Sequence, residues 1–107
     1  PSMPIAEALE TGEVSGESHE QALDRIRSIQ YEFEKTREII SWCENYSPTT
    51  NQIGGFVELL SYDPSKFMLV QRLYPLCSDK SNYQQLESSF QYDNFKMQFQ
   101  EWLADQN

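Results

Sequence analysis

The sequence predicts an all-α fold of about six short helices, arranged as three antiparallel helical hairpins of roughly 31 residues that stack as a short solenoid or collapse into a compact bundle. The first observation is a recurring corner sequence, in which a Tyr is followed at once by an acid and, four residues after the Tyr, by a Lys. The Tyr series and the Lys series both advance by 31 and then 30 residues. The recurring residues are Tyr31, Tyr62 and Tyr92, with Lys35, Lys66 and Lys96.

A second series repeats with nearly the same period. Three hydroxyl residues are each followed, three positions later, by a Gln, which is the pattern of a capping box at the start of a helix. The pairs are Ser18 with Gln21, Thr49 with Gln52, and Ser81 with Gln84, at spacings of 31 and 32. Two series with a common period indicate an internal repeat.

The first helix of each hairpin is expected to run from its capping box to just before the Tyr. Its apolar residues recur at three-and-four spacing, as on one face of a helix. They are Ala22, Ile26 and Ile29 in unit one, Ile53, Phe56, Val57 and Leu60 in unit two, and Tyr83, Leu86 and Phe90 in unit three.

The second helix of each hairpin is expected to open at the Tyr-acid pair. In unit two, Asp63 is a favourable N-cap and Pro64 a favourable first helical residue, and Pro75 should limit the helix because it lacks an N–H donor. Apolar residues continue each helix: Phe33, Ile39, Ile40, Trp42, Cys43 and Tyr46 in unit one, Phe67, Val70, Leu73 and Tyr74 in unit two, and Phe95, Phe99, Trp102 and Leu103 in unit three.

The corner sequence is interpreted as structural rather than as a ligand site. We expect each Tyr ring to lie in the core, each acid to cap the helix that follows it, and each Lys to pair with a nearby acid, as Lys66 with Asp63. A Lys in the first turn is otherwise unfavourable against the helix dipole.

Composition bounds the domain organisation and the class of partner. The net charge is -9 with a pI near 4.4, which disfavours nucleic acid and anionic lipid as partners. Residues 1–17 predict an acidic, disordered leader, with 1–4 a cloning remnant, and residues 18–107 the helical repeat domain. Neither a membrane span nor a secretion signal is recognised, so an intracellular location, in the cytoplasm or the nucleus, is expected.

Few residues carry recognisable chemistry. Cys43 and Cys77 are the two cysteines, and free core thiols are favoured over a disulfide. His19 is the single histidine, expected to be exposed and without a role. We therefore predict no enzyme activity, no catalytic residue, no metal site and no cofactor. Gly54-Gly55, inside a predicted helix, indicates a close approach of two helices, with a hinge or binding groove as the alternative.

The segment from Leu59 to Leu103 resembles the helical family named domain of unknown function 4476. The matching features are a hydrophobic pair, an aromatic-acid corner, a Lys before an aliphatic helix, and a Tyr-Pro end. They appear here as Leu59-Leu60, Tyr62-Asp63, Lys66 and Tyr74-Pro75, followed by Asp79 to Asn82 and by Phe90 to Tyr92 with Lys96. The resemblance implies a helical module appended to other domains, with no catalytic residues to carry over.

The predicted function is a non-catalytic protein–protein interaction module, an adaptor or scaffold that binds a peptide or a partner helix. An aromatic content of 13% supports this, because aromatic residues and Arg dominate interface hot spots. The alternative is a structural self-assembly unit that forms homo-oligomers. The candidate partner-binding residues are Gly54, Gly55, Lys66, Phe67, Arg72 and Tyr83.

Overall fold

Helices account for all regular secondary structure in residues 16–106, the part of the chain that the computed structural model describes. The α-helices are α1 (His19–Arg27), α2 (Glu32–Tyr46), α3 (Thr50–Val57), α4 (Asp63–Leu73) and α5 (Asp93–Ala104). Two segments are 3-10 helices, η1 (Tyr74–Leu76) and η2 (Lys80–Ser89). The predicted all-α class is confirmed, and the count is six when the three-residue η1 is taken as an extension of α4.

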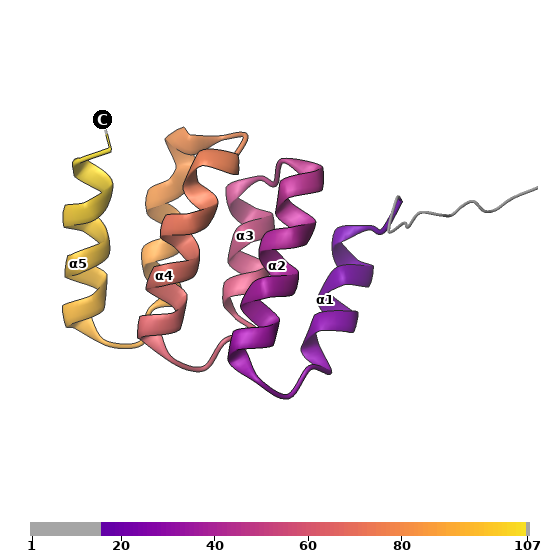
Figure 1. Ribbon diagram of the computed structural model, residues 1–107. Helices are drawn as coiled ribbons and strands as arrows, with labels where there is room; N and C mark the ends of the chain where they lie inside the picture. The colour runs from indigo at the N-terminus through magenta and orange to yellow at the C-terminus, as the bar shows by residue number, and fades with distance from the viewer. Residues whose placement is uncertain (1–15, 107) are drawn as a thin grey trace, which may run out of the picture.

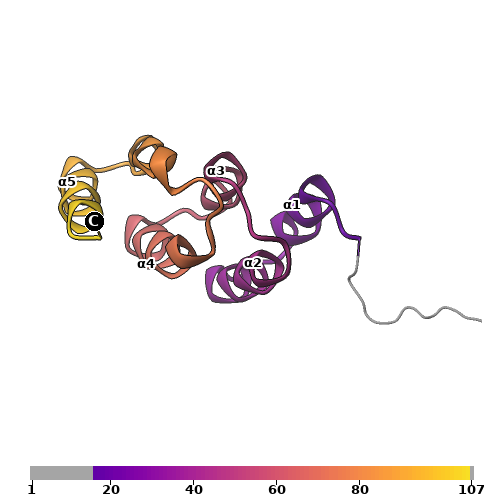
Figure 2. The ribbon, with the colours of Figure 1, turned by 90° about the horizontal axis from the view of Figure 1, so that it is seen from above.

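The helices form two rows (Figures 1 and 2). α1 packs against α3 and α3 against η2 in one row, and α2 packs against α4 and α4 against α5 in the other. Each consecutive pair, α1 with α2, α3 with α4 and η2 with α5, also packs together across a short corner. α1 and α5 lie at opposite ends of the molecule (Figure 1).

Two of the three predicted capping boxes form. The side-chain oxygens of Ser18 and Thr49 each accept from the backbone N–H of the Gln three residues on, and that Gln returns a bond to the cap N–H. The third box, at Ser81, was predicted wrongly, because the helix begins one residue earlier, at Lys80, with Asp79 as its N-cap. Ser81 is therefore already inside the helix. The segment is a ten-residue 3-10 helix, although such runs rarely exceed three or four residues.

The start and end of α4 follow the prolines. Pro64 lies in the first turn, where its missing N–H costs no hydrogen bond. α4 ends at Leu73, two residues before Pro75, and the chain continues as η1. Asp63 was predicted to cap α4, and this prediction is wrong. Its side chain instead accepts a hydrogen bond from the distant backbone N–H of Gln91, as described below.

The apolar faces of the helices meet in one continuous core. Leu69, Val70 and Leu73 of α4 are fully buried, as expected for a helix that packs on both sides. The other core residues are Ala22, Ile26, Ile39, Trp42, Cys43, Ile53, Phe56, Val57, Leu60, Cys77, Tyr83, Leu86, Phe90 and Phe99.

Both cysteines are free and buried, as predicted. Burial raises the pKa of the Cys43 thiol to about 12 and also raises the pKa of Cys77, because a thiolate loses its hydration in the core. Neither thiol is therefore activated as a nucleophile.

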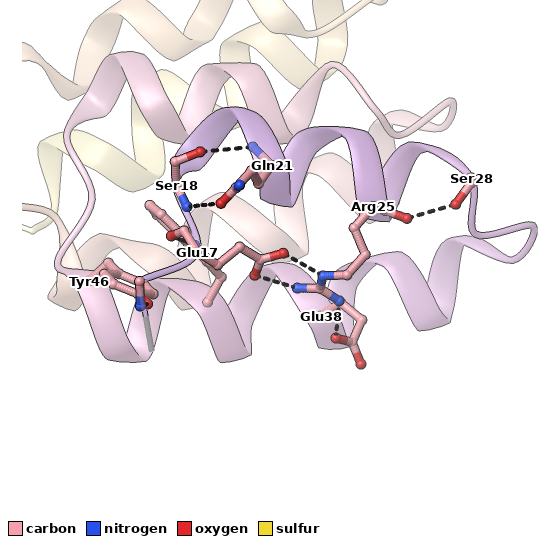
Figure 3. A network of polar contacts seen from close by, with 9 residues as sticks. Glu17, Ser18, Gln21, Arg25, Ser28, Glu38 and Tyr46 are labelled. Carbon is pink, nitrogen blue, oxygen red and sulfur yellow. Dashed lines mark hydrogen bonds and ion pairs between the residues drawn. The ribbon is translucent and has the colours of Figure 1, made fainter. Parts of the chain in front are cut away.

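The first two residues that the structure describes, Gly16 and Glu17, bond to α1 and α2. The backbone carbonyl of Glu17 accepts a hydrogen bond from the Trp42 indole N–H at 3.1 Å. The Glu17 carboxylate accepts from the Arg25 guanidinium at 2.7 and 3.0 Å (Figure 3). Gly16 donates its N–H to the Tyr46 hydroxyl at 2.8 Å. Both were assigned to the predicted leader, and the rest of that leader, including residues 1–4, lies outside the described residues.

Candidate interaction surfaces

The corner between α3 and α4 is bonded to the corner between η2 and α5 through two buried charged side chains. The Asp63 carboxylate accepts from the backbone N–H of Gln91 at 2.9 and 3.0 Å and from that of Tyr92 at 2.8 Å. The Lys66 ammonium donates to the Ser89 carbonyl at 2.7 Å and lies 4.0 Å from Asp63. The predicted pairing of Lys66 with Asp63 therefore occurs, inside a larger contact with the backbone.

The same contact joins the first corner to the second. The Lys35 ammonium donates to the Leu59 carbonyl at 3.0 Å, and the Glu32 carboxylate accepts from the Ser61 N–H. Leu59 and Ser61 stand at the same offsets from Tyr62 as the bonded Ser89 and Gln91 do from Tyr92. One difference is that the second oxygen of Glu32, Oε1, is buried without a hydrogen-bond partner among residues 16–106, whereas both oxygens of Asp63 are bonded.

The third set of corner residues is different. Asp93 is exposed and Lys96 partly exposed, and within residues 16–106 neither side chain forms a hydrogen bond or an ion pair. The groups that make both inter-corner contacts thus recur on α5, where they have no partner among residues 16–106.

The corner tyrosines point outward, which corrects the prediction that their rings lie in the core. Tyr31, Tyr62 and Tyr92 are 63%, 66% and 58% exposed. Each is the N-cap of its helix with an extended backbone, at φ of -102°, -117° and -105°. The recurrence of Tyr therefore does not reflect burial of the ring in the core.

At Gly55 the structure fits the predicted close approach, here to the His19 side chain of α1, whereas the contact at Gly54 is an ordinary one. A Cβ at Gly55 would lie 3.1 Å from Cε1 of His19, and one at Gly54 would lie 3.5 Å from Leu86. His19, expected to be exposed, is partly buried, donates from Nε2 to the Gln52 carbonyl at 2.9 Å, and packs edge-on to Phe56. The two glycines also line an open cavity of about 560 Å³ between α1, α3 and η2.

Phe67 and Tyr83 lie in an aromatic cluster instead of on a free surface. Phe67 makes edge-on contacts with Phe90, Phe95 and Trp102. Tyr83 is fully buried, and its hydroxyl donates to the Val70 carbonyl at 2.5 Å. Burial raises the pKa of the Tyr83 phenol well above its usual range.

Arg72 lies in the other row of helices, in a groove between α2 and α4. This α2–α4 groove has a volume of about 470 Å³ and is lined by Phe33, Thr36, Arg37, Glu38, Ile40, Ser41, Met68 and Arg72. Phe33 is 70% exposed and Met68 44% exposed. The Arg37 guanidinium lies 5.9 Å from the centre of the Phe33 ring, and Arg72 has no polar partner among the described residues.

The predicted partner-binding residues are therefore not brought together. Gly54 and Gly55 line one cavity, Arg72 lines the groove, and Lys66, Phe67 and Tyr83 are engaged in packing. Sequence reasoning missed Phe33 and Met68 as surface residues. Phe33 was placed among the apolar residues that continue its helix, so the local pattern did not separate it from the core residues.

Two polar networks fix the edges of these surfaces. Arg25 forms ion pairs with Glu17 and with Glu38, and the pair with Glu38 ties α1 to α2 (Figure 3). The two carboxylates raise the pKa of the Arg25 guanidinium. Asp79 accepts from the side chain of Asn82 at 3.0 Å and from the Thr50 N–H at 2.6 Å, which lowers its pKa. Asp79 thereby joins the start of η2 to the start of α3.

Residues 16–106 contain no cluster of three or more His, Cys, Asp or Glu side chains arranged to hold a metal ion. Among the helices described, none is both long enough and apolar enough to cross a bilayer.

One comparison with known proteins gives a match. The family described as Domain of unknown function (DUF4476) matches residues 13–103, most of the chain. Neither the curated proteins nor the solved structures yielded a match.

Proposed function

Since the chain belongs to the family of domains of unknown function 4476, whose description names no activity, we propose from its geometry that it is a non-catalytic protein–protein interaction module. The partner is a peptide or helix that carries an apolar side chain beside an acidic one. The observation that carries the proposal is the α2–α4 groove, in which two arginines flank exposed Phe33 and Met68.

The groove combines the residue types that dominate interface energetics. Arg and aromatic side chains are enriched among hot spots, and a Met adapts its shape to an apolar partner. Arg37 and Arg72 are cations on a chain of net charge -9, so they would attract an acidic partner to this face in particular. The exposed Arg72 guanidinium is free to bind a carboxylate in two-pronged geometry.

The arrangement that presents the groove is proposed to be a short stack of three helical hairpins, α1–α2, α3–α4 and η2–α5. Its support is the inter-corner contact, in which a carboxylate and a Lys at the same offsets bond to the backbone of the next corner in two places. An intracellular location is proposed as well, in the cytoplasm or nucleus, supported by the two free thiols.

The test selects helical peptides from a displayed random library against the full chain. We expect the selected peptides to carry Asp or Glu within one turn of a large apolar residue. Arg72→Glu should weaken their binding by about 1–3 kcal/mol, as at other charged hot spots, without changing the melting temperature.

Arg27→Glu is the matched control, because Arg27 is an exposed Arg on α1 whose surface pair with Asp24 contributes little to stability. Selected peptides without acidic residues would refute the proposal. So would equal affinity for the Arg72→Glu and Arg27→Glu variants.

A further inference from the structure

The third corner carries an unused copy of the groups that join the first two pairs of corners. Asp93 and Lys96 occupy the positions of Asp63 and Lys66 relative to the corner Tyr. Met97, the next residue, is 58% exposed, whereas the corresponding Phe67 packs on the following corner. The third corner therefore presents a carboxylate and an ammonium at the offsets used twice inside the fold, followed by an apolar side chain as in the second corner.

The first corner presents the complementary groups at the opposite end. Within the described residues, the carbonyl of Ser28 and the N–H of Gln30 form no hydrogen bond. These atoms correspond to the carbonyl and N–H groups that Lys66 and Asp63 bind. Ile29, between them, is partly exposed, whereas its counterparts Leu60 and Phe90 are only 4% and 2% exposed.

We propose that a second copy of this chain docks its first corner, residues 28–30, on the third corner of the first copy. Lys96 then donates to the Ser28 carbonyl, Asp93 accepts from the Gln30 N–H, and Met97 packs on Ile29. The proposal rests on the stacked arrangement proposed above, and it uses a surface other than the α2–α4 groove.

Such an interface joins two different surfaces, which lie at opposite ends of one molecule (Figure 1). Head-to-tail contacts of this kind continue from copy to copy, because each added molecule offers a free end, unless the rotation closes a ring. The structure thus assigns a self-association whose products exceed a dimer.

The test follows the mass of the full chain by light scattering over a range of concentrations. The mean mass of the wild type should rise past that of a dimer. Asp93→Ala should weaken association at least about tenfold, because it leaves the Gln30 N–H unpaired, and Gln30→Pro should do the same by deleting that N–H. Asp105→Ala, which removes an equal charge at the far end of α5, should have no such effect.

Mixing the two defective variants gives the sharpest readout. Asp93→Ala retains a working first corner and Gln30→Pro a working third corner, so each alone should stay monomeric and the mixture should stop at a one-to-one dimer. If circular dichroism shows that Gln30→Pro does not fold, chains carrying Gln30→Cys are mixed with chains carrying Met97→Cys under mild oxidation. A disulfide between the two kinds of chain is then expected in preference to one between like chains.

Three results would overturn the proposal: a wild-type chain that stays monomeric at every concentration, an Asp93→Ala chain that still assembles, or mixed variants that neither dimerise nor cross-link. Arg72→Glu, which addresses the groove, should leave self-association unchanged, so the failure of either proposal can be told from that of the other.

Discussion

Asp63→Ala should be strongly destabilising, because it removes a buried carboxylate that joins two corners of the fold. The Asp63 side chain is 1% exposed and accepts from two backbone N–H groups, those of Gln91 and Tyr92. The substitution also leaves the buried ammonium of Lys66 without the negative charge 4.0 Å away.

The cost follows from these contacts. A hydrogen bond to a charged group contributes about 1.5–3 kcal/mol, so two N–H groups give roughly 3–6 kcal/mol. Water reaches Gln91 and Tyr92, which are exposed residues, and it can replace part of that loss. Removal of one partner from a buried ion pair costs about 3–5 kcal/mol in other proteins, and we expect the same range here.

The measurement is urea unfolding followed by circular dichroism, with Asp93→Ala as the matched control. Asp93 is the same residue type at the same offset but has no polar partner among the described side chains, so only its effect on the helix dipole is lost, about 1 kcal/mol or less. Both variants are measured at a concentration where light scattering shows monomers. A loss below about 1 kcal/mol for Asp63→Ala, or equal losses for the two, would refute the assigned role of this contact.

Three further outcomes follow from burial, capping and charge. Tyr62→Ala should change the free energy of unfolding by no more than about 0.5 kcal/mol because the ring is exposed, whereas Tyr83→Ala should cost about 3–5 kcal/mol because its ring is fully buried. Thermal melts in which Tyr62→Ala is the more destabilising variant would contradict the structure. Thr49→Ala should cost about 1 kcal/mol through loss of its capping box, whereas Ser81→Ala should be neutral in the same urea titration, and equal losses would mean that both boxes form. Asp79 has a lowered pKa in the folded state, so its contribution to stability is present above the ordinary carboxyl pKa and is lost as the pH falls through the folded-state pKa. Asp79→Asn should therefore flatten the acid side of the curve of unfolding free energy against pH. An unchanged curve would exclude this role.

Local signals in the sequence predicted the helices well. The capping boxes at Ser18 and Thr49 and the spacing of Ile53, Phe56 and Val57 depend on neighbours within one helix, and such patterns are visible in the letters. The box at Ser81 failed because Asp79, held by a bond from Thr50 in another helix, starts the helix early. That bond spans 29 residues and leaves no trace in the local pattern.

The corner residues were found, but their roles were not. A regular recurrence of Tyr shows that the position matters without showing where the ring points. The acid at position 63 was assigned to its own helix because capping is a local rule, whereas its partners are backbone N–H groups, which every residue but Pro possesses. The co-occurrence of an acid and a Lys at fixed offsets was the one signal for a contact between corners.

The two inter-corner contacts also bear on how the chain folds. Glu32 reaches Ser61 and Asp63 reaches Gln91 across 29 and 28 residues, and the two lysines bond across 24 and 23. Loop-closure entropy rises so slowly with length that these four closures differ by only about 0.2 kcal/mol. The four contacts therefore have nearly the same entropic cost of loop closure. Contacts of such modest sequence separation favour rapid folding.

The order of these closures matches the order of synthesis. The contact from Glu32 and Lys35 needs nothing beyond residue 61, so it does not depend on any later part of the chain. The contact from Asp63 and Lys66 needs the chain only as far as residue 92. A nascent chain can therefore cover each buried charge soon after it appears, from the N-terminal side onward, without waiting for a distant segment to return.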